Sequence, residues 1–326
     1  MIPGLREEME RFMASRNVIG YAVSRYKFVR GQRVEPGRPV VIVFVARKLP
    51  PHAVPREELV PPRLKVGGVE VLTDVVEMAQ PSAVPAPRAA GAAQAGRHRP
   101  VPSGVSGAAA TSSACTIGPF FRGPGGEVYA VTCAHCAARI DVSCEVGGAP
   151  GNPFLQPSPF DGGRMPEDAI GVVAWASDIA RPQIEWDVAL VRVHEGVGVA
   201  PVIYGANVPV VDIRDVTPRD MGARVLKSGR STGVTYGEIV ALGGSVKVHY
   251  GACGTAVAVN AVVTTKMIER GDSGAALVTA GGELLGIMFA VSDKFDFAMP
   301  AAPLARTHGL ELLRYRGEPA SFSVTV

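Results

Sequence analysis

The stretch that decides the fold is residues 268–278, IERGDSGAALV, in which Ser273 lies between glycines and between two runs of strand-forming residues. A glycine lets the backbone of a tight turn adopt conformations that a side chain would forbid. Such a turn can present the hydroxyl of Ser273 outward, while the amides of Gly271 and Ser273 converge to bind an oxyanion. A serine beside a glycine is usually only part of a turn, so a catalytic role requires partners elsewhere in the chain.

Two further strings supply those partners. His135 closes the strand-like run VYAVTCAHC, where an imidazole can serve as a general base. Asp187 opens the apolar run WDVALVRV, where a buried carboxylate is out of place unless it orients the base and stabilises the imidazolium. Asp178 is the nearest competing carboxylate, but the pattern around Asp187 favours that residue. We therefore predict a Ser-His-Asp triad in the chain order His, Asp, Ser.

The composition excludes several classes of protein. The chain has 326 residues, of which 47% are hydrophobic and 6% aromatic, and it contains 38 glycines and 27 prolines. This balance favours many short strands and turns over an all-helical bundle, and it excludes disorder of the whole chain. The 33 basic and 30 acidic residues give a net charge of only +3, so a polyanion such as nucleic acid is not the expected partner.

The order of the apolar runs predicts three regions. Residues 1–80 combine a short amphipathic helix at 5–15 with a hairpin, 18–29 and 39–45, and a third strand at 69–78, which together make a small α+β module. Residues 81–113 contain no large apolar side chain and predict a flexible linker. Residues 114–326 hold short apolar runs between turn signals, among them GEIVAL, VKVHY and LLGIMFAV, and predict a β-barrel or sandwich domain.

These motifs together resemble the trypsin-like serine peptidases. TCAHC is similar to the histidine motif of the family, WDVALVRV to its aspartate strand and GDSGAALV to its nucleophile motif, and the likeness covers roughly residues 100–312. The resemblance implies a mainly β chymotrypsin-like double β-barrel, preceded here by the small α+β module. It also implies a serine endopeptidase that works through an acyl-enzyme and needs no metal or organic cofactor. The module and the string LKSGRSTGVTYGEI resemble a bacterial branch of the family.

The resemblance also implies which residues contact the substrate. The position six residues before the nucleophile, which floors the substrate pocket and is aspartate in enzymes that select Lys or Arg, is Met267 here. A basic preference is therefore disfavoured, because a buried guanidinium would meet no countercharge. Phe289, Ala290 and Val291 align with the substrate edge, and Val291 stands where large-pocket enzymes keep glycine. We expect cleavage after small or medium aliphatic residues.

The chain departs from secreted relatives in its start and in its cysteines. No IVGG-type activation sequence is present, so pairing of a freed amino terminus with Asp272 is in doubt. The odd number of cysteines argues against a disulfide framework. The resemblance matches Cys115 and Cys136 to a pair that is disulfide-bonded in secreted relatives, but in a reducing cytosol we expect buried thiols.

Several alternatives accompany this interpretation. Cys133, His135, Cys136 and Cys144 are zinc-ligand types, but adjacent His135 and Cys136 make poor tetrahedral partners, so no metal is predicted. The charged residues near the amino terminus leave no visible signal peptide, and the longest apolar run is far below the roughly 18 residues of a membrane span. We therefore expect a cytoplasmic protein with a protein or peptide substrate and no membrane partner.

The amino-terminal module leaves a second function open. Its first hairpin carries basic residues, for which a solvated face that protects the sheet edge is the expected role rather than nucleic-acid binding. The module could bind a protein partner. In that case the alternative to an enzyme is a catalytically inert protease-fold scaffold, which uses the module to recognise the partner. The basic residues are Arg25, Lys27, Arg30, Arg33 and Arg38.

Overall fold

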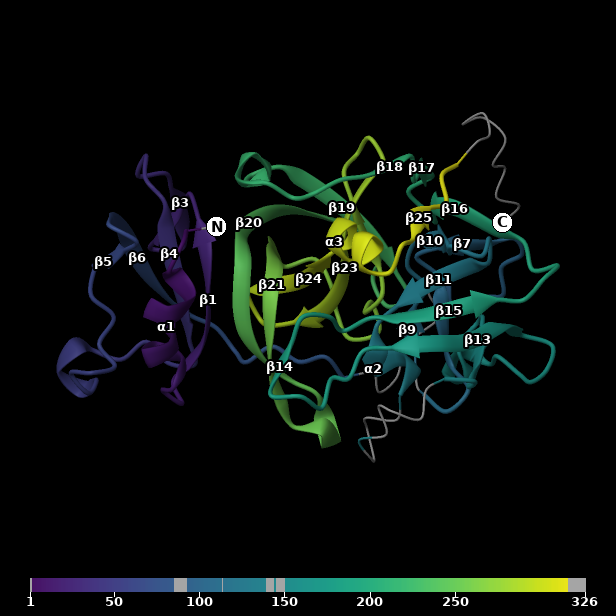
Figure 1. The fold of residues 1–326 in the computed structure, drawn as a ribbon, viewed down its shortest axis with the longest axis horizontal. Coiled ribbons are helices and arrows are strands. Elements are labelled where there is room, and N and C mark those ends of the chain that lie inside the picture. The colour runs from purple at the N-terminus through teal and green to yellow at the C-terminus, as the bar shows by residue number, and fades with distance from the viewer. Residues whose placement is uncertain (1, 85–92, 113, 139–143, 145–149, 316–326) are drawn as a thin grey trace.

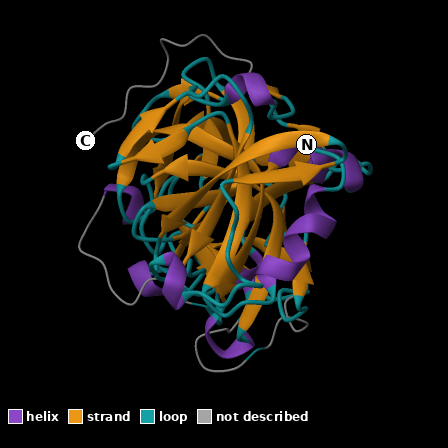
Figure 2. Cartoon of the chain, turned by 90° about the vertical axis from the view of Figure 1, so that its left-hand side faces the viewer, coloured by secondary structure: helices purple, strands orange, loops and turns teal. Residues whose placement is uncertain are grey.

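A computed structural model describes residues 2–84, 93–112, 114–138, 144 and 150–315 of the chain (Figure 1). The fold is mainly β: strands fill the centre, and the helices are short and lie around the edge (Figure 2). Two barrels stand side by side, and the amino-terminal sheet lies against the outer side of the second one (Figure 1). The chain therefore has the double-barrel architecture, with a small helix-and-sheet region in front, that the sequence predicts.

The amino-terminal region forms the helix and strands expected from its apolar pattern. The sheet runs in the order β1, β4, β6, β5, with β1 and β4 antiparallel and β4 and β6 parallel. The sequence analysis missed β5, which pairs with β6 through a turn at Gly67 and Gly68, both with positive φ. The elements are α1 (Leu5–Met13), β1 (Val18–Ser24), β2 (Lys27–Val29), β3 (Gln32–Val34), β4 (Val40–Val45), η1 (Pro51–Ala53), β5 (Arg63–Val66) and β6 (Val69–Glu77).

Strand β4 is buried on both faces, which explains its unbroken apolar sequence VVIVFV. Val41 and Val43 pack with α1 in one cluster. Ile42 and Phe44 belong to the main core of the molecule, where the ring of Phe44 contacts that of Phe297 in the second barrel. The amino-terminal region thus shares a hydrophobic core with the barrel.

The two regions also share one sheet. Strand β1 pairs antiparallel with β20 (Gly233–His249), with Gly20 opposite Val246. A Cβ at Gly20 would lie 2.4 Å from the carbonyl oxygen of Ser245, so only glycine allows the strands to approach this closely. The amino-terminal strands therefore extend the sheet of the second barrel.

The second barrel is closed by β20, which pairs with β19 on one side and with β21 on the other. The runs GEIVAL and VKVHY, expected as separate strands, are two halves of β20, since the register shifts near Gly243 and Gly244 let one long strand bend. The other elements are β14 (Gln183–Ile184), β18 (Asp212–Ile213), η5 (Pro218–Asp220), β19 (Arg224–Gly229), η6 (Gly251–Cys253), β21 (Thr255–Thr265), β22 (Ala276–Val278), β23 (Glu283–Val291), β24 (Phe295–Pro300) and α3 (Ala301–Thr307).

The first barrel is built on a sheet that runs in the order β25, β10, β11, β15, β13, β12, β8, β9, with a small sheet of β17, β16 and β7 beside it. Apolar side chains from these strands fill one cluster around Phe120 and Phe154. The elements are η2 (Ala93–Ala95), β7 (Val101–Ser103), β8 (Ser106–Ala109), β9 (Cys115–Thr116), β10 (Phe120–Arg122), β11 (Val128–Thr132), α2 (Ala134–Ala137), β12 (Pro153–Leu155), η4 (Pro159–Asp161), β13 (Ala169–Ala176), β15 (Ala189–Val193), β16 (Val199–Ile203), β17 (Val208–Pro209) and β25 (Glu311–Leu312).

The stretch expected as a linker differs from that prediction where it is described. Residues 101–109 contain β7 and β8, and both strands are buried. The small side chains are required by packing: a Cβ at Gly107 would lie 2.5 Å from the side chain of Ile117. In residues 101–109, the absence of large apolar side chains therefore reflects two closely packed strands and not a flexible linker. Residues 85–92 and 113 lie outside the described part of the chain.

Three of the basic side chains of the first hairpin pair with carboxylates: Arg25 with Glu35, Arg33 with Glu238 and Arg38 with Glu70. Such exposed pairs contribute little stability. In the described residues, no helix is both long enough and apolar enough to span a bilayer.

Candidate active site

His135 and Asp187 form a buried hydrogen-bonded pair. Nδ1 of His135 lies 2.7 Å from Oδ2 of Asp187, and the backbone amide of His135 donates to Oδ1 at 3.2 Å. Neither side chain is exposed to solvent. Because the carboxylate accepts from Nδ1, the proton is assigned to that nitrogen, which leaves Nε2 as the basic atom.

The strand pairing explains why these two residues meet. Strand β11 ends at Thr132, which pairs with Ala189 at the start of β15. His135 follows β11 on the short helix α2, and Asp187 stands two residues before β15. The competing Asp178 has a half-exposed side chain and contacts Arg181 on the surface. The fold therefore selects Asp187 as the partner of His135.

The loop of Ser273 is held between the two barrels. Gly271 and Gly274 both have positive φ, and a Cβ at Gly274 would lie 2.1 Å from the carbonyl oxygen of Thr116. Thr116 of β9 donates its amide to the carbonyl of Ser273 at 2.9 Å and its hydroxyl to that of Gly271 at 2.8 Å. The first barrel thus positions the loop of the second one; Gly274 is required by close contact, and Gly271 is favoured by its positive φ.

The hydroxyl of Ser273 donates to the carbonyl of Phe289 at 3.4 Å. Nε2 of His135 is buried without a hydrogen-bond partner among the described residues. The amides of Gly271 and Ser273 also donate to no described residue, whereas the neighbouring Asp272 amide donates to Glu269. The expected base and oxyanion donors thus form no hydrogen bond with these atoms to a described residue, and the expected nucleophile forms only one long hydrogen bond.

Asp272 accepts five hydrogen bonds in a fully buried position. Its carboxylate receives the amides of Glu269, Ser231 and Thr232, the hydroxyl of Thr232, and Nζ of Lys227 at 3.3 Å. Burial lowers the pKa of Lys227, which the neighbouring charge of Asp272 counteracts. Lys227 therefore supplies a buried countercharge to Asp272. The sequence analysis quoted Lys227 within LKSGRSTG but assigned it no role, although a lysine inside an apolar strand was a signal.

The cysteines correct an expectation. Cys115 and Cys136 form a disulfide, and Cys144 pairs with Cys253, so the prediction of buried thiols at Cys115 and Cys136 is wrong. Cys133 is the free cysteine, and it is buried. The odd number of cysteines was not evidence against disulfides, because five cysteines can form two disulfides and leave one free thiol.

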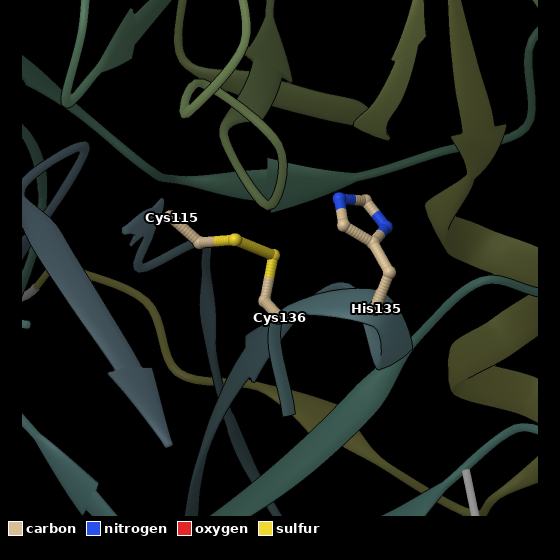
Figure 3. A group of neighbouring side chains, drawn as sticks. All are labelled: Cys115, His135 and Cys136. Atoms are coloured by element: carbon tan, nitrogen blue, oxygen red, sulfur yellow. A yellow bond between two sulfur atoms is a disulfide. The ribbon is translucent and has the colours of Figure 1, made fainter. Parts of the chain in front are cut away.

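The Cys115–Cys136 disulfide and the imidazole of His135 lie side by side (Figure 3). This disulfide links α2, which carries His135, to β9, which holds the Ser273 loop. In the zinc cluster considered from the sequence, Cys136 and Cys144 are bonded to other cysteines, and Nδ1 of His135 is bonded to Asp187. Three of the ligand atoms considered are therefore already bonded, whereas Cys133 keeps a free thiol and Nε2 of His135 has no hydrogen-bond partner among the described residues.

Tyr250 is a neighbour of the pair that the sequence did not indicate. Its side chain is fully buried, and its ring lies 6.3 Å from that of His135 in an edge-on arrangement. Burial raises the pKa of Tyr250 well above its ordinary value, and the nearby charge of Asp187 raises it further. Tyr250 comes from the turn between β20 and β21, the hairpin on which the amino-terminal sheet is built.

The expected substrate-contacting residues divide into two groups. Phe289 and Ala290 are fully buried in the main core. Met267 is buried in a separate cluster, against which Val291 packs. Met267 and Val291 thus belong to the same hydrophobic neighbourhood.

A buried carboxylate stands beside Met267, contrary to the argument that a cation there would meet no countercharge. Oδ2 of Asp296 accepts the amides of Met267 at 2.5 Å and Ile268 at 2.7 Å. Lys266 Nζ lies 3.5 Å from Oδ1. Burial raises the pKa of Asp296 to about 6, although the two amides and Lys266 counteract it. Asp296 pairs with Val291 in the antiparallel register of β23 and β24. The sequence alone does not give this register.

Comparison with known proteins identifies one domain. The model of the trypsin-like peptidase domain matches residues 117–287. No curated protein matches the sequence.

Several solved structures are similar to the chain. Thermobifida fusca protease A is 25% identical over 66% of this chain and 98% of its own, with a TM-score of 0.49. A glutamic-acid-specific serine protease, described as using a histidine triad in substrate binding, is 23% identical over 65% of this chain and 100% of its own, with a TM-score of 0.48. Cellulomonas bogoriensis chymotrypsin is 24% identical over 66% of this chain and 98% of its own, with a TM-score of 0.47.

Proposed function

Since this chain belongs to the trypsin-like peptidase family, we propose that it is a serine endopeptidase whose triad is Ser273, His135 and Asp187. The observation that carries the proposal is the buried contact of 2.7 Å between Nδ1 of His135 and Oδ2 of Asp187. A carboxylate in this position fixes the tautomer of the imidazole and stabilises the imidazolium that forms during the reaction. Nε2 is then free to accept a proton from the nucleophile.

The proposed reaction proceeds in two steps. The hydroxyl of Ser273 rotates from the carbonyl of Phe289 toward Nε2 of His135 and attacks the scissile carbonyl as His135 takes its proton. His135 returns this proton to the leaving amine. Water then hydrolyses the acyl-enzyme by the same proton transfers in reverse roles. The amides of Gly271 and Ser273 stabilise the oxyanion in both steps.

Internal cleavage is supported by the kind of edge that the substrate would meet. The end of β23, Phe289 to Val291, offers backbone groups that bind the middle of an extended peptide. The packing of Val291 against the apolar cluster that contains Met267 supports a narrow pocket and a preference for aliphatic residues. Asp296 is already bonded to two amides and lies near Lys266, so it does not by itself favour a basic residue.

The two disulfides bear on the compartment. Disulfides persist in oxidising environments and are rare in the cytosol. The pairing of four of the five cysteines therefore favours an oxidising compartment over the cytoplasm that the sequence suggested.

A fluorophosphonate probe tests the proposal, because it reacts covalently with an activated serine. We expect labelling of the wild type and none of Ser273→Ala, with unchanged circular dichroism in the variant. Equal labelling of the two proteins would contradict the assignment of Ser273. A folded wild type that is never labelled would favour the inert scaffold.

A further inference from the structure

The segment that follows β6 crosses to the second barrel and lies between the ends of two of its strands. Ser82 forms an antiparallel bridge with Val291 at the end of β23 and a parallel bridge with His249 at the end of β20. The Ser82 amide donates to the Val291 carbonyl at 3.0 Å, and the Val291 amide donates to the Ser82 carbonyl at 3.1 Å. Residues 81–83 therefore add a short strand to two edges at once.

Backbone bonds to His249 complete this contact. The amide of Ala83 donates to the carbonyl of His249 at 3.0 Å, and the amide of His249 donates to the carbonyl of Pro81 at 2.9 Å. Ala83 is 1% exposed and belongs to the same core as Tyr250, which follows His249. The segment is thus seated against the residues that surround His135.

The register extends this strand toward the nucleophile. In an antiparallel pair a step forward on one strand is a step backward on the other. The bridge to β23 is formed at Ser82 alone, and the next residue of the segment on the same side, Val84, corresponds in this register to Phe289. Phe289 is the residue whose carbonyl accepts the hydroxyl of Ser273. The segment Ser82–Ala83–Val84 therefore leads from Val291 toward Phe289, along the edge that the proposed function assigns to a peptide substrate.

The preceding residues fasten the segment at its start. The Met78 amide donates to the carbonyl of Val45 at 2.9 Å, and the Ala79 amide donates to Oδ1 of Asp293 at 2.7 Å. Lys294 Nζ donates to the carbonyl of Glu77 at 2.6 Å. Because β1 of the same region is paired with β20, the segment is tethered on both sides and its effective concentration at the edge is high.

We propose that residues 81–84 are an internal inhibitory strand, which occupies the substrate-binding edge of β23 and must be displaced before a peptide can bind. The proposal rests on the proposed function, because it assigns the edge from Phe289 to Val291 to the substrate. The proposal gives the amino-terminal region a role. The sheet of this region pairs with β20 and thereby positions the inhibitory strand at the substrate-binding edge. Access to Ser273 is then controlled by detachment of one short segment.

Two substitutions in the full-length protein test the proposal. Ser82→Pro removes the amide that bonds to Val291, and Ala83→Asp forces a carboxylate into a buried site. Gln80→Pro and Gln80→Asp are the matched controls, because Gln80 is exposed, its backbone amide donates to no described residue, and its side chain forms only a long contact of 3.4 Å with the Thr255 hydroxyl among the described residues. The readout is kcat/KM for the coumarin amide of Ser-Ala-Val, with hydrogen exchange at Ala83 to show that the segment has detached.

We expect both test variants to raise kcat/KM by roughly tenfold, the effect of about one backbone hydrogen bond, and the Gln80 controls to match the wild type. A synthetic peptide of residues 78–84 should inhibit Ser82→Pro, and a scrambled peptide should not. Wild-type kcat/KM in a variant whose Ala83 amide exchanges freely would overturn the inhibitory strand and leave the peptidase intact. Absence of fluorophosphonate labelling in every variant would instead overturn the proposed function and this inference with it.

Discussion

Lys227 and Asp272 form an ion pair in which neither side chain is exposed, with Nζ of Lys227 3.3 Å from Oδ2 of Asp272. Asp272 lies between Gly271 and Ser273, whose amides are the expected oxyanion donors. The ion pair therefore connects the interior of the second barrel to the geometry of the nucleophile loop.

Lys227→Met should damage both stability and activity. The substitution leaves Asp272 buried without a countercharge, which typically costs about 3–5 kcal/mol of unfolding free energy. Distortion of the oxyanion donors should reduce kcat/KM by about 100-fold. Urea unfolding and peptide hydrolysis measure the two effects. Lys247→Met is the control, since Lys247 bonds only to the carbonyls of Ser15 and Val18 among the described residues. Equal effects of the two substitutions would contradict the role of the ion pair.

The triad should behave as one unit. Ser273→Ala and His135→Ala should each reduce kcat by roughly four to six orders of magnitude, and the double variant should be scarcely worse than either. The reason is that the nucleophile and base act in the same proton transfer. Steady-state hydrolysis at matched protein stability provides the measurement. If the two losses multiplied in the double variant, the residues would act independently and the assignment would fail.

The cysteines should be oxidised in a defined pattern. Alkylation of the unfolded, unreduced protein should modify Cys133 alone, and reduction should expose all five cysteines. Mass spectrometry counts the added groups. Cys136→Ala should lower the unfolding free energy by about 3 kcal/mol, as expected for a bond across 21 residues, and should reduce activity because α2 carries His135. Modification of more than one cysteine before reduction would contradict the two pairs.

Asp296 should make stability depend on pH in a particular direction. Its pKa in the folded chain, about 6, lies above the ordinary value of 3.8, so the folded state binds the proton more tightly. The contribution of this proton to the free energy of unfolding is fully present below pH 4 and is lost as the pH rises through 6. This change in the free energy of unfolding is about 3 kcal/mol at most. Asp296→Asn should remove this loss and be the more stable protein at pH 7. Parallel curves for the two proteins from pH 4 to 7 would contradict the prediction.

Val291 should limit the size of the residue before the cut. Replacement by glycine removes a branched side chain that packs against the Met267 cluster and should admit larger residues. A peptide library should show relative kcat/KM for aromatic residues rising by roughly tenfold in Val291→Gly. A wild-type preference for Lys, Arg or large aromatic residues would show that the interpretation of Met267 and Val291 is wrong.

The sequence alone predicted the elements whose signals are local. The turn at Gly271–Gly274, the strand that ends before His135 and the apolar run after Asp187 each carry their own pattern. Together they predict the members of the site, and the family resemblance that they carry implies two barrels. Strand β4 was evident for the same reason, because burial on both faces requires an unbroken apolar run.

Only the tertiary structure decided how distant segments pair. Gly20 against Ser245, Ser82 against Val291, Lys227 against Asp272 and Asp296 against Met267 are contacts between residues far apart in the sequence. A stretch of small residues predicts a linker when read alone, yet residues 101–109 are buried strands because their neighbours leave room only for small side chains. A single sequence records the size and polarity of each side chain, whereas register, ion pairing and disulfide partners depend on which backbone edges meet when the core closes.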